Sequence, residues 1–233
     1  MNNVLVTGAN RGVGLAFVSA YLQRGSRVIA TCRQPSQANQ LHELQQTHGE
    51  ALIILPIDVA DPQQIAECQV EVAKRVDALH LLINNAGILR QSARLAEIEM
   101  HDLMDSFQVN AAGPVMVAKA FIELLRAGAP SKLVNITMPT QPISKLDRTE
   151  NHPYIVSRYA LNSLTKMLAL ELAEFGITTI GLYPGMIQTD MNQYSAEAVP
   201  AAEGILKAIS TIESITPDQN GLALLPDGTT YNW

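Results

Sequence analysis

The chain has 233 residues, of which 47% are hydrophobic and 16% charged, and a formal net charge of −6. This composition predicts a folded protein with a sizeable core, and the lack of any cationic run argues against nucleic acid or an anionic membrane surface as the main partner. No apolar stretch approaches the roughly 20 residues that a membrane-spanning helix requires.

Length and residue pattern also predict the number of domains, the cellular location and the absence of a bound metal. An α/β chain of this length often remains one unit, and no Ser/Gly/Pro-rich linker divides it, so we expect a single domain over residues 1–233. The beginning of the chain lacks the features of a secretory signal, which predicts a cytoplasmic location. Neither the two cysteines nor the five histidines have metal-ligand spacing, so no metal is expected.

Residues 4–31 contain the motif around which the rest of the chain is organised. An apolar run at 4–6 leads into residues 7–14, Thr-Gly-Ala-Asn-Arg-Gly-Val-Gly, then into an apolar-periodic segment over 15–22 and a second apolar run at 27–31. Glycines at such a strand-to-helix turn let the backbone approach a pyrophosphate, and the helix amides supply the anion site. We therefore predict nucleotide binding; the alternative is a tight connection without a ligand.

The Gly-x-x-x-Gly-x-Gly spacing of this turn, with a threonine in front, resembles that of the short-chain dehydrogenase/reductase family. Ordinary Rossmann dehydrogenases have Gly-x-Gly-x-x-Gly instead. The resemblance implies a nicotinamide cofactor, held here by Gly8, Asn10, Arg11, Gly12, Val13 and Gly14.

The end of the second strand predicts which nicotinamide cofactor is preferred. An acidic residue there binds the ribose 2′-hydroxyl of NAD(H), whereas an arginine accepts the 2′-phosphate of NADP(H). This chain has Cys32 and then Arg33, with Arg11 in the glycine turn, and guanidinium groups pair well with phosphate. NADP(H) is therefore favoured and NAD(H) is the second choice. The alternative is that both arginines are solvated surface residues.

The third predicted strand, at 51–56, is followed by Asp58 and Val59. The resembled family places an acid at this position beside the adenine ring of the cofactor, which assigns both residues to cofactor binding. Capping or turn formation explains Asp58 equally well.

The fourth predicted strand, at 79–83, ends in the sequence Asn-Asn-Ala-Gly at residues 84–87. In the family this segment stabilises the central sheet and passes beside the cofactor, and ligands bind at the carboxyl ends of strands in open α/β sheets. The resemblance therefore adds Asn85, Ala86 and Gly87 to the cofactor site.

A long helix is predicted over 98–127, and it carries Asn110. This residue matches the family's asparagine that kinks the helix and orders a water molecule in a proton relay. The structural alternative is that Pro114 alone causes the kink.

The fifth predicted strand, at 132–137, departs from the family pattern. The family ends this strand with Val-Asn-Ile-Ser-Ser, whose last serine donates a hydrogen bond to the substrate carbonyl, whereas this chain has Met138 at that position. A thioether cannot donate, so Met138 cannot polarise a carbonyl. A shifted loop would let Thr137 or Thr140 substitute, although neither is in register.

A polar loop over 139–153 leads to Tyr154 and Arg158, which match the family's Tyr-x-x-x-Lys with arginine in place of lysine. Residues four apart share a helix face, so the cation lies near the phenol and favours its ionised form. Arginine can also contact a ribose diol, but it does not release a proton, which puts the family's lysine-linked relay in doubt. The alternative is a packed tyrosine beside an exposed arginine.

The sixth predicted strand, at 177–182, precedes residues 183–189, Tyr-Pro-Gly-Met-Ile-Gln-Thr, and a last strand is predicted at 221–225. The family's Pro-Gly segment contacts the nicotinamide carboxamide and its threonine contacts a phosphate. The resemblance completes the predicted cofactor site with Tyr154, Arg158, Pro184, Gly185, Ile187 and Thr189.

The motifs cover essentially the whole chain, which is similar to the C-factor and sniffer-like carbonyl reductase branch. The resemblance implies one doubly wound α/β domain with a mostly parallel seven-stranded sheet in the order 3-2-1-4-5-6-7. It implies an NADP(H)-dependent oxidoreductase of a small carbonyl or alcohol substrate, weak or atypical because of Met138 and Arg158. It also implies a homodimer or homotetramer through the helices that carry Asn110 and Tyr154. A cofactor-binding regulatory protein and a non-redox biosynthetic enzyme are the alternatives.

Overall fold

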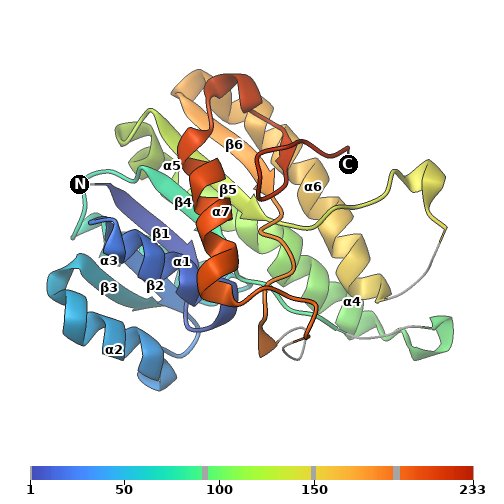
Figure 1. Ribbon diagram of the computed structural model, residues 1–233, viewed down its shortest axis with the longest axis horizontal. Coiled ribbons are helices and arrows are strands. Elements are labelled where there is room, and N and C mark those ends of the chain that lie inside the picture. The colour runs from blue at the N-terminus through green and yellow to red at the C-terminus, as the bar shows by residue number, and fades with distance from the viewer. Residues whose placement is uncertain (1, 91–93, 148–150, 191–194, 233) are drawn as a thin grey trace.

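The computed structural model describes residues 2–90, 94–147, 151–190 and 195–232. Its strands form one seven-stranded sheet in the order β3-β2-β1-β4-β5-β6-β7, every neighbouring pair being parallel (Figure 1). The predicted fold class and strand order are therefore confirmed. The strands are β1 (Asn3–Thr7), β2 (Arg27–Cys32), β3 (Leu52–Pro56), β4 (Leu81–Asn84), β5 (Ser131–Ile136), β6 (Ile177–Leu182) and β7 (Ala223–Leu224).

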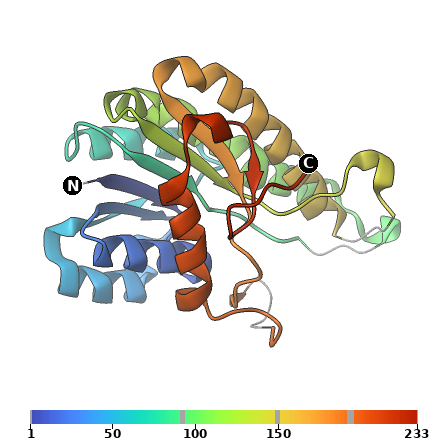
Figure 2. The same cartoon turned by 45° about the horizontal axis from the view of Figure 1, so that its top comes forward.

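Helices cover both faces of the sheet, as Figures 1 and 2 show from two directions. The helices α1 (Gly12–Gln23), α2 (Asn39–His48) and α7 (Ala201–Ser214) contribute buried side chains to the core on one face. The helices α3 (Pro62–Ala73), α5 (Gly113–Ala127) and α6 (His152–Leu172) do so on the other, where α4 (Met100–Phe107) packs against α6.

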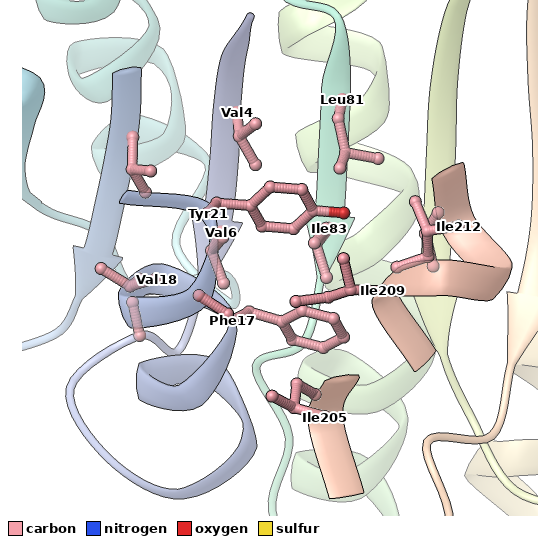
Figure 3. Packing of buried hydrophobic residues seen from close by; sticks show 14 of the residues in the cluster. Val4, Val6, Phe17, Val18, Tyr21, Leu81, Ile83, Ile205, Ile209 and Ile212 are labelled. Carbon is pink, nitrogen blue, oxygen red and sulfur yellow. The ribbon is translucent and has the colours of Figure 1, made fainter. Parts of the chain in front are cut away.

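Successive side chains of each strand point to opposite faces of the sheet, so the buried residues form two cores, one on each face. Val4 and Val6 of β1 face α1 and α7, whereas Leu5 between them faces the other helices. Figure 3 shows the first of these cores, with Phe17 lying against the isoleucines of α7. Because both faces are buried, the strands are continuous apolar runs, as is typical of parallel sheets.

The predicted helix over 98–127 needs a correction, because the structure divides it. α4 ends at Phe107, a π-helical segment follows over Gln108–Ala112, and α5 begins at Gly113. Pro114 has no N–H with which to bond the carbonyl of Asn110, which loosens the helix at this place. The Asn110 side chain, which bonds Ile88, lies within this π-helical segment.

Other boundaries move by a few residues. The glycine turn contributes the beginning of α1, which starts at Gly12 and not at 15. The segment predicted as strand over 79–83 forms β4 at Leu81–Asn84, because the Leu79 amide bonds Leu124 in α5. In the predicted loop over 139–153, a short 3-10 helix forms at Ile143–Lys145, and residues 148–150 lie outside the described part.

One buried tyrosine of the α1 core permits a stability prediction. Tyr21 is 5% exposed, and its hydroxyl has no hydrogen-bond partner among the described residues (Figure 3). We expect Tyr21→Phe to raise the free energy of unfolding by about 1 kcal/mol, because it removes an unsatisfied buried polar group and keeps the ring. Denaturant unfolding measures this change.

Tyr159→Phe is the matched control, since the Tyr159 hydroxyl donates to the Gln141 carbonyl at 2.6 Å and its loss should destabilise the protein. Equal destabilisation by both variants would contradict the account.

No helix in the described part of the chain is both long and apolar enough to cross a membrane.

Candidate functional site

A cleft of about 350 Å³ lies at the carboxyl ends of the strands, where open α/β sheets bind ligands. Every residue predicted to bind the cofactor lines it. The lining residues predicted from the sequence are Gly8, Asn10, Arg11, Gly12, Val13, Gly14, Arg33, Asp58, Val59, Asn85, Ala86, Gly87, Thr137, Met138, Tyr154, Arg158, Pro184, Gly185, Ile187 and Thr189. Sequence reasoning gave no role to the other lining residues, Cys32, Ile57, Ile88, Val109, Ile136, Tyr183, Met186 and Asp190.

The glycine turn is shaped so that only glycine fits. Gly8 has φ +63°, and a Cβ there would lie 2.8 Å from the Cα of Ala86. A Cβ at Gly14 would collide with the carbonyl oxygen of Gly8. Arg11 is the N-cap of α1 and its side chain makes no capping bond, and the first-turn residues Gly12, Val13 and Gly14 line the cleft. Such a helix terminus is suited to an anion such as phosphate.

The residue Asn85 holds this turn against the end of β4. Its Nδ2 donates to the carbonyls of Thr7 at 2.9 Å and Gly8 at 3.1 Å. The Thr7 hydroxyl accepts in return from the backbone amides of Asn85 and Ala86. The Asn-Asn-Ala-Gly segment therefore fixes the floor of the cleft by fixing the glycine turn.

The polar groups at the β2 and β3 end of the cleft have different surroundings. Arg11 forms an ion pair with Asp190 at 3.0 Å, both side chains being exposed, so it already has an anionic partner. Arg33 is exposed and, within the described ranges, makes no hydrogen bond or ion pair. Asp58 accepts a hydrogen bond from the Ala60 amide, so it forms the predicted turn and also lines the cleft.

Asn110 is fully buried and lies behind the cleft. Its Oδ1 accepts from the Ile88 amide at 2.8 Å, and its Nδ2 donates to the Ile88 carbonyl and to the hydroxyl of Ser157. Asn110 thus ties the segment after β4 to α6. The observed contacts are those of a positioning residue.

Arg158 lies against Tyr154 on α6, one helical turn further on. Its Cζ is 4.7 Å from the centroid of the Tyr154 ring, and its Nη1 donates to the Ile136 carbonyl at 3.2 Å. Arg158 is 6% exposed, so the alternative of an exposed arginine is wrong. Its Nε has no hydrogen-bond partner, and across residues 2–90, 94–147, 151–190 and 195–232 no carboxylate pairs with it.

The end of β5 corrects one expectation about the missing serine. Met138 lines the cleft at that position, as expected. The Thr137 hydroxyl donates to Oδ1 of Asn162 at 2.6 Å, and Thr140 accepts from Nδ2 of the same residue at 3.1 Å. The single O–H of Thr137 is therefore already engaged in a hydrogen bond, and Thr140 does not line the cleft. Both threonine hydroxyls thus bond Asn162 of α6, a contact that is not evident from the sequence.

Tyr183 is a second phenol in the cleft, and it was missed as a site residue. It follows β6 directly and is half-buried. Burial, and to a lesser extent the nearby Tyr154 phenol, raise the pKa of Tyr183 above its usual value. The available signal was its place immediately before the Pro184-Gly185 segment.

Among the residues that the structure describes, no group of three or more His, Cys, Asp or Glu side chains is arranged to hold a metal ion. The site therefore consists of a glycine turn, two phenols and a buried guanidinium. This arrangement can hold an extended anionic ligand at one end and deliver a proton or a hydrogen bond at the other.

Comparisons with known proteins agree with this geometry. A family model described as short chain dehydrogenase matches residues 2–200. The NADPH-bound carbonyl reductase from chicken fatty liver has a TM-score of 0.93 and 30% identity, with 100% of this chain and 99% of that chain covered. The carbonyl reductase Sniffer of D. melanogaster has a TM-score of 0.92 and 30% identity, with 100% of both chains covered. The short-chain dehydrogenase RED3 of Pyricularia oryzae is 29% identical over 252 residues, 99% of this chain and 98% of that protein.

Proposed function

The chain belongs to the short-chain dehydrogenase family, and from this membership we propose that it is an NADP(H)-dependent oxidoreductase acting on a carbonyl or alcohol substrate. The observation that carries the proposal is that one cleft contains both the uncapped amides of α1 and the Tyr154 phenol with its stacked guanidinium. The likeness to an NADPH-bound carbonyl reductase, at 30% identity, supports the choice of cofactor and of reaction.

The residues present fit a nicotinamide dinucleotide phosphate. The glycine turn leaves space that a Cβ would fill, and a Cβ at Gly12 would come within 3.0 Å of the Thr189 side chain. The α1 amides and Thr189 would hold the pyrophosphate, and Arg33 the 2′-phosphate. The buried guanidinium of Arg158, which bonds the Ile136 carbonyl and stacks on the Tyr154 ring, would contact the ribose diol.

The chemistry is divided between the cofactor and the protein. NADPH, when bound, supplies a hydride to the carbonyl carbon. Tyr154 holds the proton that ends on the carbonyl oxygen, as a general acid within the cleft. Asn110 positions the segment after β4 and α6, and Arg158 keeps a positive charge beside the phenol. Met138 contributes no donor, so turnover is slow unless another hydroxyl in the cleft replaces the serine.

A role without carbonyl reduction is the second candidate, favoured by Met138 at the position of the serine. In that case the protein binds the nicotinamide cofactor and responds to it without turnover, or catalyses a non-redox step. Oxidation of NADPH by the purified protein, followed over a panel of aldehydes and ketones, separates these functions. Carbonyl-dependent oxidation supports the reductase. Binding of the cofactor, with no NADPH oxidation in the presence of any member of the panel, supports the second candidate.

Cofactor choice depends mainly on Arg33, because Arg11 is already paired with Asp190. A charge-assisted contact to the 2′-phosphate contributes about 1.5 to 3 kcal/mol, so we expect NADPH to bind at least about tenfold more tightly than NADH. Arg33→Ala should remove most of this difference, whereas Arg11→Ala should remove less. Calorimetric titrations of both cofactors measure it. Equal binding of NADPH and NADH by the wild-type protein would refute the assignment.

We also propose that the whole chain acts as one cofactor-binding unit and assembles as a homodimer or homotetramer in the cytoplasm. Exposed apolar side chains on α4 and α6 support the assembly, with Met100 at 72%, Met104 at 49% and Phe107 at 44% exposed on the first helix, and Met167 and Leu170 exposed on the second. Burial of these side chains between copies would gain free energy in proportion to their apolar area.

A further inference from the structure

We propose that Tyr183 donates to the substrate carbonyl oxygen the hydrogen bond that Met138 cannot donate, so that two tyrosines polarise the carbonyl. The inference rests on the proposed reductase function and names a residue that the family pattern does not use. In the described part of the cleft, the lining hydroxyls belong to Thr137, Tyr154, Tyr183 and Thr189. The Thr137 hydroxyl donates its hydrogen bond to Asn162, and Thr189 lies beside Gly12 at the phosphate end.

The sheet register places Tyr183 beside the vacant donor position. Ile136 of β5 pairs with Leu182 of β6, and the Thr137 amide donates to the Leu182 carbonyl at 2.9 Å. Tyr183, the first residue after β6, is therefore level with Thr137, the residue that precedes Met138 after the end of β5. The two strands lie side by side in Figure 1. The Tyr183 hydroxyl therefore reaches the cleft from the end of β6, next to the strand that precedes Met138.

Strand alternation directs Tyr183 toward the helix that carries Tyr154. Asn135 of β5 bonds Thr165 of α6, so the side chains at alternate positions from Asn135 face α6. Gly181 pairs with Asn135, and Tyr183 lies two residues beyond Gly181 on the same face of the sheet. The side chains of Tyr183 and Tyr154 therefore enter the cleft on a common side.

The Tyr183 hydroxyl is available as a donor. It makes no hydrogen bond to any residue that the structure describes, whereas the hydroxyl of Tyr159 on α6 is bonded to Gln141. Burial and the Tyr154 phenol raise the pKa of Tyr183, so this phenol stays protonated throughout the neutral range. Its O–H bond remains intact in the reaction, because the proton that reaches the carbonyl oxygen comes from Tyr154. Tyr183 only shares the negative charge that develops there.

The test is Tyr183→Phe, which keeps the ring and removes the donor. We expect kcat/KM for carbonyl reduction to fall by about 100-fold or more, the usual cost of one such donor, with the Kd for NADPH unchanged. Met138→Ser should recover most of the loss in the Tyr183→Phe background and change the wild-type rate much less. Tyr21→Phe, on the far side of the core, is the control and should leave the rate unchanged. An unchanged kcat/KM in Tyr183→Phe, or no recovery by Met138→Ser, would overturn the inference.

A second readout does not need turnover. Benzamide has a carbonyl that the enzyme cannot reduce, and calorimetry measures its binding to the protein with NADP⁺. Loss of one hydrogen bond to its oxygen should weaken this binding by about tenfold in Tyr183→Phe. If the wild-type protein oxidises no NADPH but shows this difference, the reductase proposal fails and the role of Tyr183 in carbonyl binding stands. Equal binding by both proteins, or no binding to the wild-type protein, would overturn the inference.

Discussion

Tyr154→Phe is expected to lower kcat for carbonyl reduction by about 1000-fold while leaving NADPH binding nearly unchanged. A positioned general acid contributes about 10² to 10⁴ in rate, and removal of the phenolic hydroxyl takes away the proton without removing the ring on which Arg158 stacks. Steady-state kinetics gives the rate, and a calorimetric or fluorescence titration gives the Kd for NADPH.

The control for this variant is Tyr159→Phe, five residues further along α6, whose hydroxyl bonds the Gln141 carbonyl outside the cleft. It should retain turnover, because its phenol does not line the cleft. A Tyr154→Phe protein that keeps the wild-type rate with intact cofactor binding would remove Tyr154 from the mechanism.

Arg158→Met is expected to have opposite effects on activity and on stability. Methionine is apolar and of similar length, so the variant loses the charge beside Tyr154 and the ribose contact, and kcat/KM should fall by about 100-fold or more. The free energy of unfolding should rise by about 1 kcal/mol, because a buried guanidinium without a carboxylate partner carries a desolvation cost. Kinetics and denaturant unfolding on the same protein measure both.

Arg158→Lys keeps the positive charge and is the matched control. It should retain more activity than Arg158→Met, because a cation still lies within reach of the phenol and the ribose. If Arg158→Met kept wild-type kcat/KM, the guanidinium would be a structural residue only, and the account of its role would be wrong.

The strands could be located in the sequence because both faces of this sheet are covered, whereas the strand order was predicted from the resemblance to the family. Apolar runs such as 4–6 and 27–31 then form strands with few alternatives. The π-helical segment at Gln108–Ala112 was not predicted, because it depends on a bond between Asn110 and Ile88 across the cleft wall. Local propensity contains no information about such a contact.

The candidate site was predictable where backbone geometry sets the residue type. Gly8, Gly14 and Asn85 are required by the close approach of β1, α1 and β4, so the sequence motif corresponds directly to the packing. The side-chain hydrogen bonds were not predictable. Asn162 of α6 accepts a hydrogen bond from Thr137, and Tyr183 enters the cleft from the end of β6, and both depend on contacts between segments far apart in the chain.

Hydride transfer from NADPH to a carbonyl carbon, with Tyr154 giving the proton, is the central claim. Its most direct test is reduction of a ketone with NADPH deuterated at the transferred position of the nicotinamide ring, with mass spectrometry of the alcohol product. The account predicts deuterium on the carbinol carbon with the wild-type protein and a product yield lower by about 1000-fold with Tyr154→Phe. Binding of NADPH without any deuterated alcohol from the wild-type protein, across the carbonyl panel, would contradict it.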